Sequence, residues 1–312
     1  MKPTDFIWRN GEMVAWDDAR VHVMSHGLHY GSSVFEGIRC YETPTGPAIF
    51  RLQDHIRRLF DSARIYRMDI PHSREDICQA CRDIITVNSL TNAYIRPLVF
   101  FGMGTLALNG LNACQVETAI GAFQWGTYLG KEGLEQGIDA CISSWNRTTS
   151  SSIPVMAKAG GHYLNAQLIC TEAHRHGYLE GLSVSGNGML AEGSGENVFV
   201  VRDGRISTPP LAASILGGIT RDAVFRIAES LGHRIVEESI PREMLYIADE
   251  VFLTGTAAEV TPIRSVDQIP VGEGQPGPIT RSIQKAFFGL FDGSQADQWN
   301  WLDPVGTPSG TA

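Results

Sequence analysis

The sequence has few cysteines, few basic residues and no long apolar run, and each shortage excludes a class of protein. Six cysteines in 312 residues are too few for a disulfide-stabilised scaffold. The 25 lysines and arginines stand against 34 acidic residues, and the net charge of -9 disfavours nucleic acid as a partner. No stretch approaches the ~18 apolar residues of a membrane helix, and the N-terminus lacks a signal-peptide pattern. We therefore expect a cytoplasmic protein that binds neither membrane nor nucleic acid.

The length and hydrophobic content predict two folded domains of mixed α/β class. At ~150 residues per domain the chain makes about two, and 43% hydrophobic residues supply a large core. Glycines and charges interrupt the apolar pattern at residues 126–133. We predict a small N-terminal α/β domain at residues 1–126, an inter-domain loop at 127–136 and a larger domain at 137–312.

Alternating and helical patterns locate the main elements. Short β-type runs predict strands at 6–8, 34–41, 48–50, 93–100, 139–145, 182–184, 197–201 and 250–253. Apolar residues at helical spacing predict helices at 54–66, 73–87, 163–176, 221–231 and 279–291. Ser73 and Asp76 predict a capping box, and Pro97 predicts that its strand lies at a sheet edge or bulge. The polar tail from residue 292 is expected to be loosely ordered.

Cys78 and Cys81 form a C-x-x-C pair inside the helical pattern at 73–87. A structural zinc site needs four ligands, and this pair supplies only two. Small buried thiols explain the pair better, so we predict no metal site.

Lysine is scarce, and the four lysines are Lys2, Lys131, Lys158 and Lys285. Three of them lie in a tail, a polar linker or a charged helix. Lys158 has no Asp, Glu, Lys or Arg within ten residues on either side. Desolvation among small and apolar neighbours lowers the pKa of an amine and makes it nucleophilic. From the residues alone, a Schiff-base lysine and a lysine extended from a loop edge both remain open.

Three further segments could bind a flat anionic cofactor. Residues 216–220 lead into a helix, where backbone N–H groups and the Thr220 hydroxyl can meet an anion, although a plain glycine turn fits equally. Residues 254–259 follow an apolar strand and form either a second small-residue cup or an ordinary strand exit. In residues 186–197, a G-x-G-x-x-A pattern leads into a strand-like run rather than a helix, which excludes a dinucleotide fingerprint and leaves Glu192 among glycines. A nucleophilic lysine, a phosphate cup and a lone carboxylate are what pyridoxal phosphate needs.

At this combination the chain resembles the bacterial branched-chain-amino-acid aminotransferases from Ile7 to about Trp301. The resemblance rests on a series of motifs in order: VHVMSH at 21–26, YG at 30–31, VFEGIR at 34–39, YIRPL at 94–98, SWNR at 144–147, AKAGG at 157–161, EGSGEN at 192–197, GITRD at 218–222 and GTAAE at 255–259. It implies the two-domain fold type IV architecture of pyridoxal-phosphate enzymes, with a β-barrel-like core in the larger domain.

The resemblance assigns cofactor roles by position. It implies that Lys158 forms the covalent link to pyridoxal phosphate and shuttles a proton, that Glu192 pairs with the ring nitrogen, and that Tyr163 donates to the phenolic oxygen. The implied phosphate binders are Arg58, Ile219, Thr220 and Thr256. Without the resemblance, Arg58 reads as a solvated helix residue.

The resemblance also implies a pocket for amino acids and 2-oxo acids. Tyr94 and the backbone at Thr256 and Ala257 are expected to receive the α-carboxylate, and Arg96 the distal acid of glutamate. The implied apolar wall and its neighbours are Tyr30, Phe35, Gly37, Leu108, Trp125, Tyr128 and Tyr163. Tyr30 and Leu108 match positions that a neighbouring subunit supplies, which implies a homodimer or homohexamer. From the residues alone, the aromatics also fit an ordinary core.

The implied activity is transamination between leucine, isoleucine or valine and 2-oxoglutarate. Other activities of this fold are D-amino-acid transamination and aminodeoxychorismate cleavage, and cofactor binding without turnover is a further alternative. The chain departs from the usual pattern with His162 in place of Asn, Ser185 in place of Asp and Gly217 in place of Pro, and the loop at 101–110 lacks the usual prolines after Asn109.

Overall fold

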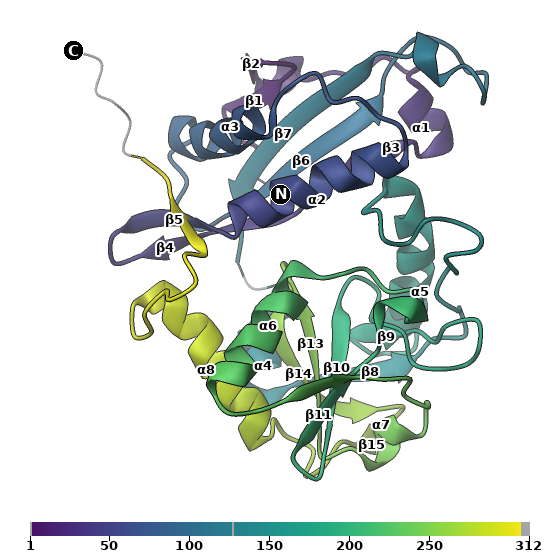
Figure 1. Cartoon of the computed structure of the whole chain (residues 1–312), viewed down its shortest axis with the longest axis vertical. Helices are drawn as coiled ribbons and strands as arrows, with labels where there is room; N and C mark the ends of the chain where they lie inside the picture. Colours follow the sequence, from purple (N-terminus) through teal and green to yellow (C-terminus); the bar gives the residue numbers. More distant parts are fainter. Residues whose placement is uncertain (1, 127, 307–312) are drawn as a thin grey trace. The chain divides into compact units, whose positions relative to one another are not determined.

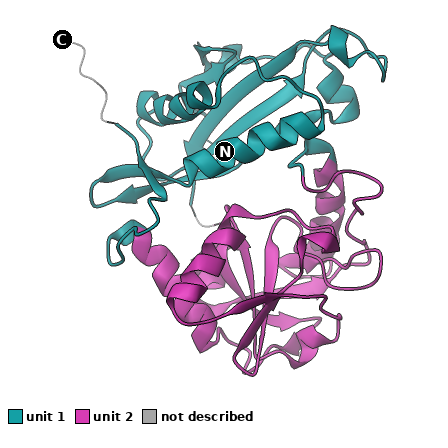
Figure 2. Ribbon diagram, viewed as in Figure 1, with its two compact units in different colours: residues 1–126, 157–161, 291–312 teal, residues 127–156, 162–290 magenta. Residues whose placement is uncertain are grey.

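The computed structural model describes residues 2–126 and 128–306, and the chain divides into two compact units (Figure 2). Unit 1 takes residues 1–126, 157–161 and 291–312, and unit 2 takes residues 127–156 and 162–290. The expected inter-domain loop contains helix α4, Gly130–Gln136. Its first residue, Thr127, lies outside the described residues, as do residue 1 and residues 307–312 of the expected domains. Both units combine helices and strands, which confirms the predicted α/β class.

Unit 1 is built on an antiparallel sheet with the strand order β16-β5-β4-β6-β7-β1-β2, and β3 pairs with β6 (Figure 1). Its strands are β1 (Phe6–Arg9), β2 (Glu12–Ala15), β3 (Ser33–Phe35), β4 (Ile38–Thr43), β5 (Gly46–Phe50), β6 (Ala93–Phe101), β7 (Val116–Gln124) and β16 (Leu302–Pro304). The long β6–β7 pair runs from Ala93 opposite Gln124 to Phe101 opposite Val116. The sheet places residues from distant parts of the sequence side by side.

The expectation that Pro97 marks an edge strand is wrong, because β6 lies inside the sheet. On one side β6 pairs with β7, and on the other it pairs with β4 up to Ile95 and with β3 from Leu98. Pro97 stands at the break between β3 and β4, where no ladder N–H is required. Its carbonyl accepts a hydrogen bond from the Glu36 N–H at 2.8 Å.

Three helices belong to this part of unit 1: α1 (His26–Tyr30), α2 (Leu52–Ile65) and α3 (Arg74–Val87). The apolar faces of α2 and α3 share one core with the sheet, through residues such as Ile56, Leu59 and Ile84. The predicted capping box is present, because Ser73 accepts from the Asp76 N–H while the Asp76 carboxylate accepts from the Ser73 N–H. Burial raises the pKa of the Cys78 thiol to about 11, which agrees with a packing role for the C-x-x-C pair.

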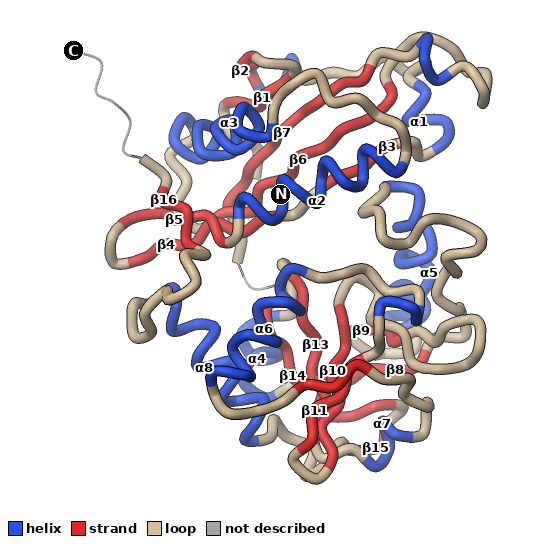
Figure 3. Tube along the Cα trace, viewed as in Figure 1, coloured by secondary structure: helices blue, strands red, loops and turns tan. Residues whose placement is uncertain are grey.

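The tail was expected to be loosely ordered, and for residues 292–306 this is wrong. Trp301 is buried, stacks on Trp299 with ring centroids 4.3 Å apart, and meets the Phe50 ring edge-on at 5.8 Å. Strand β16 then pairs with β5 (Figure 3). The aromatic side chains therefore anchor a segment whose polar composition suggests disorder.

Unit 2 has a mixed sheet with the order β12-β11-β10-β13-β14-β8-β9, and β15 pairs with β14. Its strands are β8 (Ile138–Ile142), β9 (Glu180–Leu182), β10 (Asn197–Arg202), β11 (Arg205–Thr208), β12 (Ile235–Glu237), β13 (Glu250–Gly255), β14 (Glu259–Val266) and β15 (Ile269–Pro270). The helices are α4, α5 (Tyr163–Arg175), α6 (Ile219–Ser230), α7 (Met244–Ile247) and α8 (Pro278–Asp292), the last of which ends in unit 1.

Strand β10 is buried on both faces of its sheet. Successive side chains of a strand point to opposite faces, and both sets are covered here. Val198 and Val200 join one apolar core. Phe199 stacks on Phe252 of β13, with ring centroids 4.9 Å apart, and also meets Phe225 of α6 at 6.0 Å. Helix α6 is thereby fixed against the sheet with its N-terminus beside the start of β10. None of the helices in residues 2–126 and 128–306 has the length and apolar content that a membrane crossing requires.

Candidate active site

Lys158 lies in unit 1, in the short segment 157–161. Its backbone is held on both sides, since its N–H donates to Ser62 Oγ at 3.0 Å and its carbonyl accepts from the Phe35 N–H at 3.0 Å. Ala159, the next residue, forms an isolated antiparallel bridge with Val34. The Lys158 Nζ lies 5.1 Å from the centroid of the Phe35 ring. The amine therefore stands at a fixed place over an aromatic face.

The predicted substrate residues Tyr94 and Arg96 point to the same side of β6, as the alternation predicted. The Arg96 Nη2 donates to the Tyr94 hydroxyl at 3.3 Å, and the guanidinium lies 4.6 Å from the Phe35 centroid. Phe35 is thus in contact with both Lys158 and Arg96. Gly37 is required here, because a Cβ at that position would overlap the Tyr94 hydroxyl. Together these residues form a patch of one amine, one guanidinium, one phenol and one apolar ring.

Trp125, from the end of β7, extends this patch. Its ring lies 5.0 Å from Tyr94 and 5.5 Å from Phe123. Trp125 is only partly buried. The aromatic cluster therefore presents an apolar wall beside the Tyr94 hydroxyl.

Arg58 projects from α2 into a buried ionic cluster. Its Nε and Nη2 donate to the two oxygens of Glu36 at 2.6 and 2.8 Å, and His55 Nδ1 donates to Glu36 Oε2 at 2.7 Å. Burial opposes ionisation of Glu36, but the Arg58 charge and the hydrogen bonds from Arg58 and His55 outweigh it and hold the pKa of the carboxyl well below its usual range. Burial lowers the pKa of His55, so the ring is neutral. The Arg58 side chain is thus oriented rather than solvated.

Glu192 lies in unit 2 and is anchored by one ion pair and two hydrogen bonds. Arg147 Nε forms an ion pair with Glu192 Oε1 at 2.6 Å, and Oε2 accepts from Asn197 Nδ2 at 3.1 Å and from the Leu216 N–H at 3.0 Å. Glu192 is only 4% exposed. Partners of this kind hold a buried carboxylate in one orientation, which suits a partner for a ring nitrogen.

The N-terminus of α6 provides the predicted glycine turn. Gly218 is the N-cap, Ile219 and Thr220 are the first helical residues, and both are buried. A side chain at Gly218 would overlap Asn197 Oδ1. The turn is therefore packed against the residue that also contacts Glu192. Backbone N–H groups and the positive end of a twelve-residue helix favour an anion at this position.

The remaining predicted residues of unit 2 lie on separate elements. Thr256 and Ala257 are half-buried in the turn between β13 and β14. Tyr163 is the first residue of α5 and is half-buried, whereas Tyr128 is 44% exposed.

Tyr30 and Leu108 are the two predicted apolar-wall residues of unit 1 that are exposed. They are 48% and 73% exposed, and the Tyr30 hydroxyl donates to the Leu106 carbonyl at 3.0 Å. Other large apolar side chains of the same unit are also exposed, namely Val23, Leu28 and Met103. Their exposure is what a second copy of the chain could cover.

Two further carboxyl groups, Glu180 and Glu196, lie close to Glu192 in the sequence. Glu180 and Glu196 are both buried, and Glu196 Oε2 accepts from the Gly195 N–H at 3.0 Å. Burial and the neighbouring Glu180 charge raise the pKa of Glu196 well above its usual value, and burial also raises that of Glu180. The pair therefore retains a proton at a pH where exposed carboxyls are ionised.

Five residues around the site had no predicted role: Glu36, His55, Ser62, Arg147 and Asn197. A partial signal was present for one group, since His55, Arg58 and Ser62 recur at three and four residues and so share a face of α2. Arg147 and Asn197 lie in the SWNR and EGSGEN motifs, but only the fold reveals that both contact Glu192.

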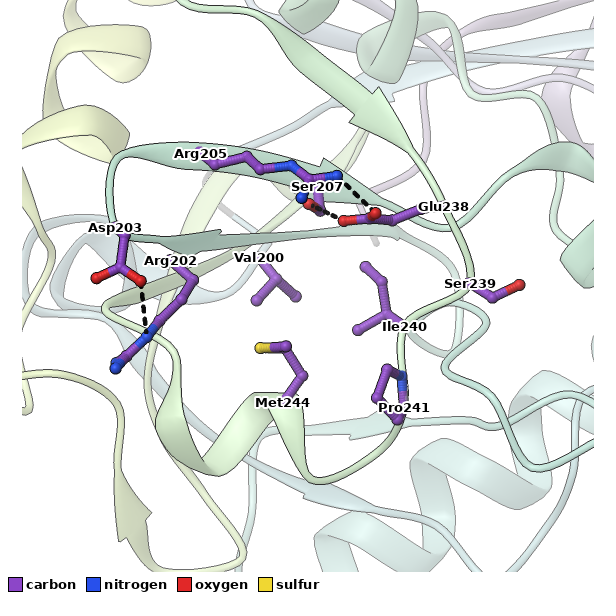
Figure 4. Close-up of a pocket in the computed structure, with 10 residues that line it drawn as sticks. All are labelled: Val200, Arg202, Asp203, Arg205, Ser207, Glu238, Ser239, Ile240, Pro241 and Met244. Carbon is purple, nitrogen blue, oxygen red and sulfur yellow. Dashed lines mark hydrogen bonds and ion pairs between the residues drawn. The ribbon is translucent and has the colours of Figure 1, made fainter.

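Figure 4 shows a hollow in unit 2 that contains none of the predicted site residues. Its volume is about 490 Å³, and its charged side chains pair with one another. Arg205 Nη2 lies 2.6 Å from Glu238 Oε2, and Ser207 donates to Glu238 Oε1 at 2.5 Å. Arg202 pairs with Asp203 at 3.5 Å. These mutual pairs account for the charges on the rim without a ligand.

Known proteins resemble this chain over nearly its full length. Residues 33–266 match the family model of the class IV aminotransferases. The branched-chain-amino-acid aminotransferase of Salmonella typhimurium is 56% identical over 304 residues, which cover 97% of this chain and 98% of that protein. The Pseudomonas aeruginosa protein of the same name is 47% identical over 95% of each chain.

Solved structures agree with these sequence relatives. The Escherichia coli branched-chain amino acid aminotransferase has a TM-score of 0.96 and 56% identity, covering 97% of this chain and 100% of that one. The Thermobaculum terrenum branched-chain amino acid aminotransferase, solved in its PLP-form, has a TM-score of 0.90 and 37% identity over 97% of this chain and 99% of that one. The predicted fold is confirmed, and the chain belongs to the class IV aminotransferases.

Proposed function

We propose that this protein transfers amino groups between leucine, isoleucine or valine and 2-oxoglutarate with pyridoxal phosphate as cofactor. The observation that supports it most is the grouping of Lys158, Phe35, Tyr94 and Arg96 in unit 1. An amine for proton transfer lies beside an apolar ring that can receive an aliphatic side chain. A guanidinium that can receive a second acid contacts the same ring. The branched-chain aminotransferases that the chain resembles along its length support the same activity.

Polar groups within each unit fit particular parts of the cofactor. Glu192 is a buried carboxylate that can hold a proton on a ring nitrogen. The Gly218 turn begins helix α6, and the positive end of this helix favours an anion. We assign the covalent link to Lys158, the ring nitrogen to Glu192, the phenolic oxygen to Tyr163 and the phosphate to Arg58, Ile219, Thr220 and Thr256. When bound, pyridoxal phosphate supplies a ring that accepts electrons from the substrate α-carbon.

Lys158 has two tasks in this proposal. Its Nζ binds the cofactor between turnovers and, once the substrate amine replaces it, takes the α-proton of the amino acid. Ser62 and Phe35 fix the backbone on either side of the residue, so the amine moves only by side-chain rotation. The tight backbone anchoring limits the positions from which the proton is taken, and orientation of this kind lowers the barrier.

The proposed reaction requires one pocket to accept both an aliphatic side chain and a second carboxylate. We assign these two tasks to Phe35 and Trp125 and to Arg96, respectively. Burial of aliphatic carbon against the aromatic wall contributes ~0.8 kcal/mol per CH₂. The 2-oxoglutarate acid instead meets Arg96, which can offer two parallel hydrogen bonds to a carboxylate. Tyr94, with the backbone of Thr256 and Ala257, is assigned to the α-carboxylate that all substrates share.

Self-association and a cytoplasmic location are part of the proposal. We infer a homodimer or homohexamer in which Tyr30 and Leu108 reach the neighbouring site, supported by their exposure among other apolar side chains. The six cysteines are free and five of them are buried, which suits a reducing compartment.

The direct test is an assay of the purified protein with leucine, 2-oxoglutarate and added pyridoxal phosphate. We expect conversion of leucine that depends on 2-oxoglutarate, with little reaction of D-alanine. A preference for D-alanine would indicate the D-specific activity of the same fold. A yellow preparation that does not change when leucine is added would indicate cofactor binding without turnover.

A further inference from the structure

The buried cluster of Glu36, His55 and Arg58 includes two residues with no assigned part in the chemistry. We infer that Glu36 is a positioning residue, which holds the Arg58 guanidinium in one orientation for the cofactor phosphate. The inference rests on the proposed function, in which Arg58 binds that phosphate. Glu36 would thus contribute to the site without touching the cofactor, through its contact with Arg58.

The geometry of the pair fixes the guanidinium plane. Both Glu36 oxygens are engaged by Arg58, through Nε at 2.6 Å and Nη2 at 2.8 Å, so rotation about the terminal bonds of the arginine breaks a hydrogen bond. Glu36 itself is fully buried. It is held by His55 Nδ1 at 2.7 Å and by the bond from its own N–H to the Pro97 carbonyl. The carboxylate is therefore a rigid support.

The same helix face connects this support to Lys158. His55, Arg58 and Ser62 follow one another at three and four residues on α2, and Ser62 accepts from the Lys158 N–H. Glu36 directly follows Phe35, whose N–H donates to the Lys158 carbonyl. Phe35 and Glu36, together with one face of α2, thus hold Arg58 and the Lys158 backbone in fixed positions relative to each other.

The charges of the cluster make the inference testable. Glu36 is ionised, Arg58 is positive and His55 is neutral, so the cluster has no net charge before a phosphate arrives. If charge alone governed phosphate binding, removal of the Glu36 charge would tighten it, because the Arg58 charge would no longer be offset. If orientation governs it, the same change weakens binding. The two explanations predict opposite signs.

The experiment measures equilibrium binding of pyridoxal phosphate and of pyridoxal, which lacks the phosphate, to the apoenzyme of each variant. Glu36→Gln is expected to weaken pyridoxal phosphate binding by about 10- to 100-fold, the range found when the hydrogen-bond partner that orients a metal ligand is lost. Pyridoxal binding is expected to stay within about twofold of wild type. Unchanged or tighter binding of pyridoxal phosphate would overturn the inference.

A matched control is Asp54→Asn on the same helix. Asp54 also accepts from arginines, but its donors are Arg51 Nε at 2.8 Å and Arg57 Nη2 at 3.3 Å. This variant removes the same charge and is expected to bind both compounds as wild type does. An equal loss in Asp54→Asn would show that nearby charge, not Arg58 orientation, is responsible.

Two further variants separate positioning from a general structural role. Glu36→Asp keeps the charge but withdraws it by one methylene group, so it is expected to lose phosphate-dependent affinity; it also decides the matter if Glu36→Gln does not fold. In an Arg58→Lys background, Glu36→Gln is expected to cause little further loss, because the two residues act as one unit. A full additional loss in the double variant would contradict the inference. A wild-type apoenzyme that binds neither compound would instead refute the proposed function.

Discussion

Arg96 illustrates how a single side chain can serve one substrate of a pair and not the other. It is exposed on β6, donates to the Tyr94 hydroxyl and covers the Phe35 ring. Leucine needs the apolar surroundings, whereas glutamate needs the charge. We therefore expect the half-reaction of glutamate to depend on the Arg96 charge more than the half-reaction of leucine does.

Arg96→Ala is expected to lower kcat/KM for glutamate by about 10- to 100-fold, since a hydrogen-bonded charge contributes roughly 1.5–3 kcal/mol. The loss for leucine should be several-fold smaller, because leucine has no distal acid. Steady-state kinetics with both amino acids measures the two losses in one protein. Equal losses would mean that Arg96 does not bind the distal acid.

Glu196 governs a pH dependence of stability. Its pKa is raised in the folded state by burial and by Glu180, so the folded chain keeps a proton that the unfolded chain releases near pH 4.5. Stability contributed by that proton is present below the unfolded pKa and falls as the pH rises, by up to ~1.4 kcal/mol per pH unit. Glu196→Gln is therefore expected to gain stability relative to wild type as the pH rises above about 4.5 in denaturant titrations. A difference between Glu196→Gln and wild type that stays constant as the pH rises would contradict the prediction.

Local sequence sufficed to single out Lys158 as a candidate, but not the residues that contact its neighbours. Its small and apolar neighbours are adjacent in the chain, so composition alone singles it out among four lysines. Glu36 and Arg147 acquire meaning only from their distant partners Arg58 and Glu192. Such pairing depends on the fold, and a single sequence contains no local trace of it.

The helices and strands were predictable where the signal is local. The capping box at Ser73, the amphipathic faces of α2, α3 and α6, and the stop at Gly232, whose φ is +80°, all follow from neighbouring residues. The edge position predicted from Pro97 was wrong because a proline is compatible with an inner strand where the pairing with the adjacent strand is interrupted. The prediction of a loosely ordered tail from residue 292 was wrong because packing of two tryptophans orders the segment despite its polar composition. In both cases a tertiary contact overrides the local tendency.

The turn before α6 provides a test at a single element. Gly218→Ala would force Asn197 away, and Asn197 donates to Glu192 and to the Leu216 carbonyl. We expect a loss of pyridoxal phosphate affinity of about tenfold or more, measured by titration of the apoenzyme. Gly217→Ala is the matched control, because its Cβ would lie 3.6 Å from the Leu211 side chain, an ordinary contact. Equal affinities in the two variants would contradict the packing role of Gly218.

Unit 1 exposes large apolar side chains that the proposed self-association would cover. Leu108 is 73% exposed and Leu28 is 64% exposed, and burial against a second copy would remove this apolar surface from water. Leu108→Asp is expected to weaken self-association and to lower activity as the protein is diluted. Sedimentation velocity over a range of concentrations measures the first effect. Leu231→Asp, at an exposed position in unit 2 that has no proposed contact, is the control, and equal dissociation of both variants would contradict a role for Leu108.

The identity of the reactive amine is tested most directly by borohydride reduction of the purified holoenzyme, followed by sequencing of the labelled peptide. The cofactor is expected on the peptide that contains Lys158, and on no other. A label on Lys2, Lys131 or Lys285, or no label at all, would contradict the assignment of Lys158 and the function built on it.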